Sequence, residues 1–183
     1  GQPRLKPPFP AVVGAFGGPT VVNNVETLAN VPRILENGSE WYAGIGSERN
    51  AGTRIFGVSG HVQKPGLFEL PMGTPLQEIV DMAGGVLEGH EIKAVIPGGS
   101  SAPALKPNEL DTPADFDSLM KAGSMAGSGG LIVMDERTNL VAVTRRLLEF
   151  YAHESCGQCT PCREGVPWML RIVKRIERGE GKT

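Results

Sequence analysis

The three cysteines of this chain lie in one short run with the spacing Cys-x2-Cys-x2-Cys, formed by Cys156, Cys159 and Cys162. Cysteines that act only as small apolar core residues are normally scattered among buried segments. Three thiols at this spacing can point at one centre, and thiolates are the usual ligands of iron–sulfur clusters. A four-iron cluster takes four thiolates, so the pattern predicts a cluster whose fourth ligand comes from outside this chain.

Two other interpretations of this run stay open on the residues alone. The first is three free thiols in a corner between helices. The second is structural zinc, which is usually held by two separated cysteine pairs or by cysteine with histidine. His153 stands three residues before Cys156 and could complete a Cys3His site. A bacterial ferredoxin run is excluded, because its fourth cysteine would stand where this chain has Val166. Cluster ligation is the favoured interpretation.

The composition is that of an ordinary soluble globular protein, with 40% hydrophobic and 21% charged residues. A net charge of −2 gives no reason to expect nucleic acid or an anionic membrane surface as a partner. No apolar run approaches the ~20 residues that span a bilayer, so we expect membrane association only through partner proteins. Clustered cysteines favour a reducing compartment. The chain opens at Gly1, and we expect it to be part of a longer polypeptide.

The amino-terminal part is predicted to be irregular and then helical. Residues 4–18 are rich in proline and glycine, which favours an extended, irregular segment. Asn24 is a good N-cap, and apolar residues follow it at helical spacing as far as Leu35. Pro32 lies inside this stretch, so we expect it to kink or split the helix.

The middle of the chain predicts a small ubiquitin-like (β-grasp) unit. Strands over 55–62 and 67–71 flank the turn signal Lys-Pro-Gly, which indicates a hairpin. A helix follows, with Thr74 as the expected N-cap and Gln77 completing a capping box. A further strand is expected over 93–96. The apolar run at 131–135 predicts a buried strand, which we assign to a return path out of this unit.

Two amphipathic helices are predicted to flank the cysteine run. The first begins at Thr138 or Asn139 and extends to Tyr151, and the second carries apolar residues from Val166 to Ile176. Each helix needs a partner for its apolar face.

Four motifs give the chain a resemblance to a known family. Residues 4–11, 19–28, 57–62 and 150–165 resemble the NADH-binding, flavin-carrying subunit of respiratory complex I, and the resemblance runs essentially from end to end. Related subunits of soluble NAD-reducing hydrogenases and NAD-dependent formate dehydrogenases share the cysteine run and the neighbourhood of residues 23–27. The motif at 4–11 resembles the complex I branch more closely.

The resemblance implies an activity and a set of cofactors. In that family NADH gives a hydride to FMN, which passes single electrons to iron–sulfur clusters and on to quinone. By motif match, Asn23, Asn24 and Thr27 are expected to bind FMN, and Lys6 and Phe9 to lie near NADH. Cys156, Cys159 and Cys162 are expected to be three of the ligands of a [4Fe-4S] cluster. The glycine-rich flavin loop of the family is not found in this sequence.

The chemistry of these residues agrees with that assignment. An asparagine pair at a helix amino terminus offers amide donors beside exposed backbone N–H groups, which suits a phosphate. Lys6 supplies a point charge, and Phe9 an aromatic face for stacking. Simple N-capping would equally explain Asn24, and a solvated charge and a core anchor would explain Lys6 and Phe9.

The expected fold class is a combination of α/β and α+β parts. We expect 1–52 to end a flavin-binding α/β domain, 53–104 to form an inserted β-grasp (SLBB-like) unit, 105–137 to return to the flavin domain, and 138–183 to begin a helical iron–sulfur domain.

The family resemblance also implies partners and a location. These are a small [2Fe-2S] subunit and the large iron–sulfur subunit of the peripheral arm, on the cytoplasmic side of a bacterial inner membrane or the mitochondrial matrix side. The alternatives are a diaphorase subunit of a soluble NAD-reducing hydrogenase or formate dehydrogenase, and a non-catalytic interaction module stapled by zinc.

Overall fold

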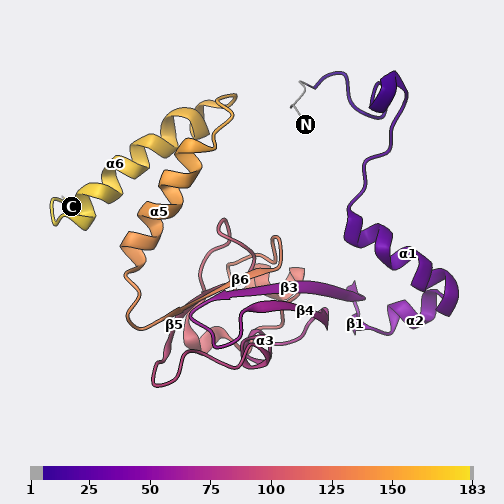
Figure 1. The fold of residues 1–183 in the computed structure, drawn as a ribbon, viewed down its shortest axis with the longest axis horizontal. Coiled ribbons are helices and arrows are strands. Elements are labelled where there is room, and N and C mark those ends of the chain that lie inside the picture. The colour runs from indigo at the N-terminus through magenta and orange to yellow at the C-terminus, as the bar shows by residue number, and fades with distance from the viewer. Residues whose placement is uncertain (1–5, 182–183) are drawn as a thin grey trace.

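The computed structural model describes residues 6–181, arranged as a central sheet with helical segments on two sides (Figure 1). Helices α5 and α6 form a hairpin on one side of the sheet in this view, and α1 and α2 lie on the other. The helices are α1 (Val25–Asn37), α2 (Ser39–Ala43), α3 (Leu76–Met82), α4 (Phe116–Lys121), α5 (Leu140–His153) and α6 (Val166–Glu177). The strands are β1 (Gly46–Ser47), β2 (Asn50–Ala51), β3 (Thr53–Gly60), β4 (Gly66–Pro71), β5 (Ile92–Ile96) and β6 (Gly130–Asp135).

The main sheet has four strands in the order β4-β3-β6-β5. Strands β3 and β4 form the expected antiparallel hairpin, β6 runs parallel to β3, and β5 runs antiparallel to β6. A hairpin, a helix across one face and two further strands, of which the last lies centrally and parallel to the first, make up a β-grasp arrangement. The predicted β-grasp unit and the mixed helix and sheet class are confirmed.

The assignment of residues 131–135 to a return path was wrong. Strand β6 lies between β3 and β5, and its Leu131 is paired with Val58. A continuous apolar run is typical of any strand covered on both faces, so the pattern alone could not show which sheet it joins. The β-grasp sheet therefore extends past the expected boundary at residue 104, as far as Asp135. The other domain boundaries stay predictions.

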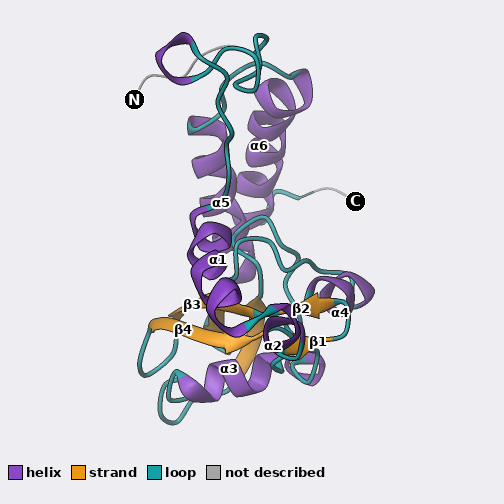
Figure 2. Cartoon of the chain, turned by 90° about the vertical axis from the view of Figure 1, so that its right-hand side faces the viewer, coloured by secondary structure: helices purple, strands orange, loops and turns teal. Residues whose placement is uncertain are grey.

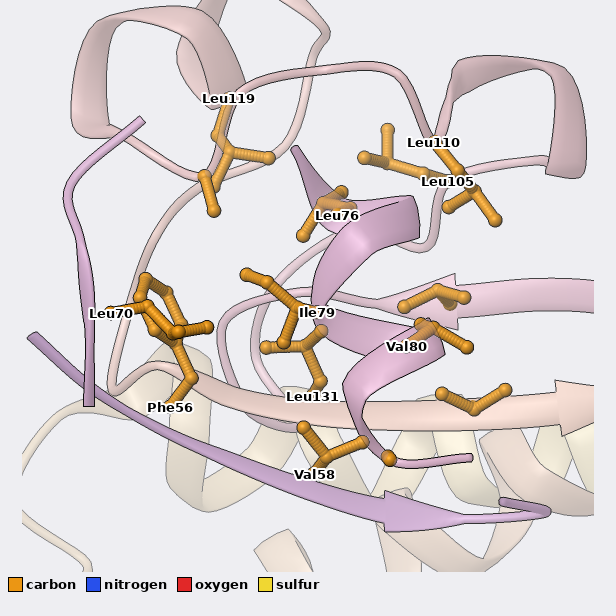
Figure 3. Close-up of a cluster of buried hydrophobic side chains, with 14 of the residues drawn as sticks. Phe56, Val58, Leu70, Leu76, Ile79, Val80, Leu105, Leu110, Leu119 and Leu131 are labelled. Carbon is orange, nitrogen blue, oxygen red and sulfur yellow. The ribbon is translucent and has the colours of Figure 1, made fainter. Parts of the chain in front are cut away.

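One face of the sheet and helix α3 enclose the main apolar core (Figure 3). In β3 the residues alternate, so that Phe56 and Val58 turn inward and are almost fully buried. Leu76, Ile79 and Val80 of α3 are completely buried against them. The long connection between β5 and β6 closes this core, with buried leucines at 105, 110 and 119.

The backbone N–H groups at the amino end of α3 donate to the segment between β5 and β6, and no capping box is formed. The backbone N–H groups of Leu76 and Gln77 donate to the carbonyls of Thr112 and Leu110, at 3.1 and 2.9 Å. The Thr74 hydroxyl donates to the Pro71 carbonyl instead of capping the helix. The predicted capping box was wrong, because a distant segment supplies the acceptors that a local side chain would otherwise supply.

Two glycine turns approach each other closely beside the sheet. The Ser128 N–H donates to the Gly98 carbonyl at 2.9 Å. A Cβ atom at Gly98 would lie 2.2 Å from the Met125 carbonyl oxygen, so no side chain fits at residue 98. Both segments are turns of the backbone.

Helix α1 begins as predicted and continues further than predicted. The Asn24 side chain accepts the Thr27 N–H, and the helix runs unbroken through Pro32 to Asn37. The predicted splitting at Pro32 is not found. Among the described residues no helix is both long enough and apolar enough to cross a membrane.

Candidate functional site

The cysteine loop lies at the tip of the α5–α6 hairpin, at the end of the molecule away from the sheet (Figure 2). Cys156 and Cys159 are exposed and Cys162 is half-buried, and all three thiols are free. The segment from Lys6 to α1 extends to the same end of the molecule in both views. Exposed free thiols are unlike core cysteines, which are buried. The loop is thus accessible for binding a metal centre.

Hydrogen bonds within the loop define its shape. Gly157 adopts a φ of 76°, a conformation that glycine accepts readily. Its carbonyl accepts a hydrogen bond of 2.9 Å from the Arg163 guanidinium, and the Arg163 backbone N–H donates to the Cys159 carbonyl at 3.0 Å. The Cys162 thiol donates to the Ser155 hydroxyl at 3.2 Å. Arg163 and Ser155 therefore tie the first half of the loop to the second.

Cys162 lies in a π-helical turn, Pro161–Gly165, that leads directly into α6. Such turns are rare and occur frequently at functional sites. The amino terminus of α6 carries partial positive charge from its aligned peptide dipoles. This local field suits thiolate ligands and an anionic cluster.

Zinc and a four-iron cluster need different spacings of the sulfur atoms that bind them. With Zn–S bonds of about 2.3 Å, a tetrahedral zinc site holds its sulfurs about 3.8 Å apart. Within residues 6–181, one group of three candidate ligands lies within 4.8 Å of one another, and it does not include the cysteines. A four-iron cluster places iron and sulfide between its ligands and so takes them further apart. In the described residues the three thiols are thus not preassembled at the spacing of a single bound zinc ion.

His153 does not support a Cys3His site. Its side chain is 85% exposed, and its Nδ1 atom lies 2.9 Å from a carboxylate oxygen of Glu154. The ring is therefore engaged with its neighbour along the chain, at the end of α5.

The three-residue group that does converge is His90, Asp135 and Glu136, where β6 leads into α5. Asp135 is fully buried and accepts a hydrogen bond of 3.0 Å from the Arg137 guanidinium. That bond, with the charges of Arg137 and His61, lowers the pKa of Asp135 to about 2. The hydrogen bond from His90 lowers the pKa of Glu136. The Arg137 guanidinium already binds the Asp135 carboxylate. These residues therefore stabilise the connection between β6 and α5 and do not form a cation site.

The proposed flavin residues lie at the amino terminus of α1, and all three are exposed. Oδ1 of Asn24 accepts the Thr27 N–H at 3.0 Å, and Oδ1 of Asn23 accepts the Asn24 N–H at 2.9 Å. With both side-chain oxygens turned to the backbone, the amide NH2 groups are presented as donors. Capping and phosphate binding are therefore compatible functions of Asn24.

The nucleotide residues lie in a different place from the flavin residues. Lys6 and Phe9 line one cavity of about 480 Å³ with residues 10–11 and 19–22. Asn24 and Thr27 line another, of about 690 Å³, between α1 and the sheet. The structure does not gather these residues into one cavity. Arg4, the first residue of the family motif, lies outside the described residues.

Comparisons with known proteins agree with this geometry. Residues 142–183 match the iron–sulfur binding region of NADH-ubiquinone oxidoreductase-F, and residues 55–103 match the SLBB domain. The F 2 subunit of NADH-quinone oxidoreductase in Rhizobium meliloti (strain 1021) is 57% identical over 183 residues, which cover 100% of this chain and 44% of that protein.

The chain belongs to the family of NADH-quinone oxidoreductase F subunits.

Other members give the same result. The F subunit of Rickettsia bellii (strain OSU 85-389) is 55% identical over 185 residues, again across 100% of this chain and 44% of the relative. The chain thus spans less than half the length of these relatives. A crystal structure of an NAD+-reducing [NiFe]-hydrogenase in the air-oxidized state superimposes with a TM-score of 0.82 at 38% identity, over 97% of this chain and 30% of that one.

The comparisons confirm the family, and they confirm an iron–sulfur binding region whose matched residues include the cysteine loop. The individual ligand and nucleotide assignments stay predictions. The sequence analysis did not single out Glu26, whose carboxylate accepts the Ile55 N–H, or Ser155, whose hydroxyl accepts the Cys162 thiol. Both lie inside the motifs of the family resemblance, where Glu26 has the pattern of a first helical turn and Ser155 is only a neighbour of Cys156.

Proposed function

We propose that this chain forms part of the NADH dehydrogenase flavoprotein subunit of complex I, which oxidises NADH through FMN and passes electrons to a [4Fe-4S] cluster and on to quinone. The observation that carries this proposal is the loop with three free thiols, in a chain that aligns from end to end with F subunits of NADH-quinone oxidoreductase.

In this proposal Cys156, Cys159 and Cys162 hold three irons of the cluster, and the fourth ligand comes from outside this chain. The free state of the three thiols and the exposure of Cys156 and Cys159 support it. The bound cluster would supply one-electron transfer. Arg163 keeps the loop in shape by donating to the Gly157 carbonyl, and Ser155 by accepting from the Cys162 thiol.

Asn23, Asn24 and Thr27 would bind the phosphate end of FMN, which supplies the hydride chemistry when bound. The amide donors presented beside the amino terminus of a thirteen-residue helix support this assignment. Lys6 would neutralise a phosphate of NADH, and Phe9, 60% exposed beside a cavity, would offer a face for stacking. The sharing of one cavity by Lys6 and Phe9 supports their acting together on NADH.

The proposal includes the surroundings of the protein. Its partners would be the small [2Fe-2S] subunit and the large iron–sulfur subunit of the peripheral arm. It would lie on the cytoplasmic side of the bacterial inner membrane, or the matrix side in mitochondria, and reach the membrane only through the parent complex. Residues 1–52 would then belong to the flavin domain and 138–183 to the helical iron–sulfur domain.

A second candidate is the diaphorase subunit of an NAD-reducing hydrogenase. The superposition on a hydrogenase structure supports it, but the identity of 38% is lower than the 57% shared with the Rhizobium meliloti relative. Co-purification with membrane-arm subunits would support the complex I assignment, and co-purification with hydrogenase subunits would overturn it.

Metal analysis of the intact flavoprotein tests the cluster. We expect about four irons and four sulfides per chain, a brown colour and a reduced-state EPR signal. Cys156→Ser, Cys159→Ser and Cys162→Ser should each lose the four-iron signal, with Ser101→Ala as a control away from the loop. Stoichiometric zinc without iron would overturn the electron-transfer function.

A further inference from the structure

Helix α1 is attached to the β-grasp sheet through a carboxylate. Glu26, in the first turn, accepts at Oε1 a hydrogen bond of 2.8 Å from the backbone N–H of Ile55 in β3. Strand β6 pairs with β3 only from Gly57 onward, and β4 occupies the opposite edge. The Ile55 N–H therefore lies on the part of the edge that β6 does not reach, and Glu26 supplies the acceptor that a strand would otherwise provide.

Apolar packing contributes little to the position of α1. The helix has no buried residue, and Leu28 and Leu35 are 52% and 81% exposed. Glu26, in contrast, is half-buried. Between the helix and the sheet lies the cavity of about 690 Å³, whose lining includes Asn24, Glu26, Thr27, Arg54 and Phe116. The carboxylate thus spans a space that apolar side chains do not fill.

The place of Glu26 along the helix determines what the bond controls. An acidic residue in the first turn ordinarily stabilises its own helix through the dipole. Here the carboxylate reaches a backbone N–H of another element. Because the bond is made within one turn of Asn23 and Asn24, it fixes the end of the helix that presents their amide groups.

We propose that Glu26 is a positioning residue for flavin binding: it holds the amino terminus of α1 at a fixed distance from β3, so that the amide donors of Asn23 and Asn24 meet the FMN phosphate. Glu26 itself does not contact the flavin. This inference rests on the proposed function, because the role of the two asparagines in binding FMN belongs to that proposal.

The test compares three variants of the intact flavoprotein purified within its complex. Glu26→Ala removes the acceptor, Glu26→Gln keeps a carbonyl oxygen in its place, and Glu36→Ala removes a carboxylate of the same helix that pairs with Arg33 at the surface. Three quantities are measured: the FMN dissociation constant after flavin removal and reconstitution, the KM for NADH of the flavin-saturated enzyme, and hydrogen exchange of a peptide containing Ile55.

We expect Glu26→Ala to weaken FMN binding about tenfold and to speed exchange of the Ile55 amide, because a charge-assisted hydrogen bond is lost. Glu26→Gln should restore most of both properties, and Glu36→Ala should leave them unchanged. The KM for NADH and the cluster EPR signal should not move in any variant, since Glu26 acts on the flavin site alone.

The outcomes separate the inference from the proposed function. Faster exchange at Ile55 with unchanged FMN affinity would overturn the positioning role, and unchanged exchange would overturn the attachment itself. Failure of Glu26→Gln to restore affinity would also contradict the role of the acceptor. A wild-type protein that binds no FMN would overturn the proposed function, and the inference with it.

Discussion

The hydroxyl of Tyr151, in the last turn of α5, lies 2.6 Å from the hydroxyl of Ser100, in the loop after β5. This hydrogen bond joins the β-grasp unit to the helix that leads into the cysteine loop. Apolar contact between α5 and the sheet is slight, with Val143 packing against a small cluster that includes Ala94, Ile96 and Met134. The position of the hairpin on the sheet therefore depends on a few polar contacts.

Removing the Tyr151–Ser100 bond should loosen that attachment. We expect Tyr151→Phe and Ser100→Ala each to lower the free energy of unfolding by about 1 kcal/mol, the usual net value of one hydrogen bond. The double variant should cost less than the sum of the two, because both remove the same interaction. Denaturant unfolding measures this, with the exposed neighbour Ser101→Ala as control. Fully additive effects would show that the two hydroxyls do not interact.

The buried carboxylate of Asp135 should make stability depend on pH at the acid end. Its pKa is lowered from 3.8 to about 2 in the folded protein, so the folded state favours the ionised form. The stabilisation is complete above the unfolded pKa, and it is lost as pH falls from about 4 towards 2.

The variant Asp135→Asn should be less stable at neutral pH and should show a flatter loss of stability between pH 4 and 2. Unfolding midpoints measured across this range test the prediction. Glu36→Gln is a suitable control, because that carboxylate is exposed and pairs with Arg33 at the surface. If stability falls with decreasing pH as steeply in Asp135→Asn as in the wild type, the prediction is wrong.

Substitution of Asn24 can separate helix capping from phosphate binding. Aspartate caps as well as asparagine does, so Asn24→Asp should leave stability unchanged while its charge repels the FMN phosphate and weakens binding at least about tenfold. Asn24→Ala should lose about 1 kcal/mol of stability as well as affinity. Thermal unfolding and FMN titration give the two readouts.

A control for the added charge is Asn108→Asp, in the turn Pro107–Glu109 far from α1 along the chain. If Asn24→Asp binds FMN like the wild type, Asn24 is an N-cap without a function in flavin binding.

Arg163 should raise the reduction potential of the cluster. Its guanidinium closes the loop on the Gly157 carbonyl and brings positive charge beside the cysteines, partly offset by Glu164 at 3.1 Å. We expect Arg163→Glu to lower the midpoint potential by an amount on the order of tens of millivolts, since added negative charge disfavours reduction. A redox titration followed by EPR measures it, with Arg175→Glu in the last turn of α6 as the charge-matched control. If Arg163→Glu and Arg175→Glu have the same midpoint potential, the specific effect of Arg163 on the cluster is refuted.

Local signals in the sequence predicted local structure well. The Asn24 and Asn139 caps, the hairpin and the helices around the cysteine loop depend on neighbouring residues, and the structure has them. The errors concern contacts between distant segments. Thr74 has the pattern of an N-cap, yet the carbonyls of Leu110 and Thr112 satisfy that helix end, and no residue near Thr74 indicates them.

In the candidate site too, local features could be predicted from the sequence and contacts between distant residues could not. The spacing of Cys156, Cys159 and Cys162 can be read from the sequence because one loop holds all three. The contact of Glu26 with Ile55 joins residues far apart in sequence, and a glutamate in a first helical turn looks the same whether or not it has such a partner. The spacing of residues along the sequence does not show which distant residues lie close together in the fold.

Because β6 lies in the middle of the sheet, the sheet cannot form during translation until β6 has been synthesised. The hairpin β3–β4 and helix α3 leave the ribosome first, but the inner edge of β3 has no partner strand until residues 130–135 emerge. Long-range pairing of this kind delays folding, so the unit waits for its last strand. The cysteine loop follows soon after that strand in the chain. The three cysteines therefore leave the ribosome only after the last strand of the sheet, when that sheet can fold.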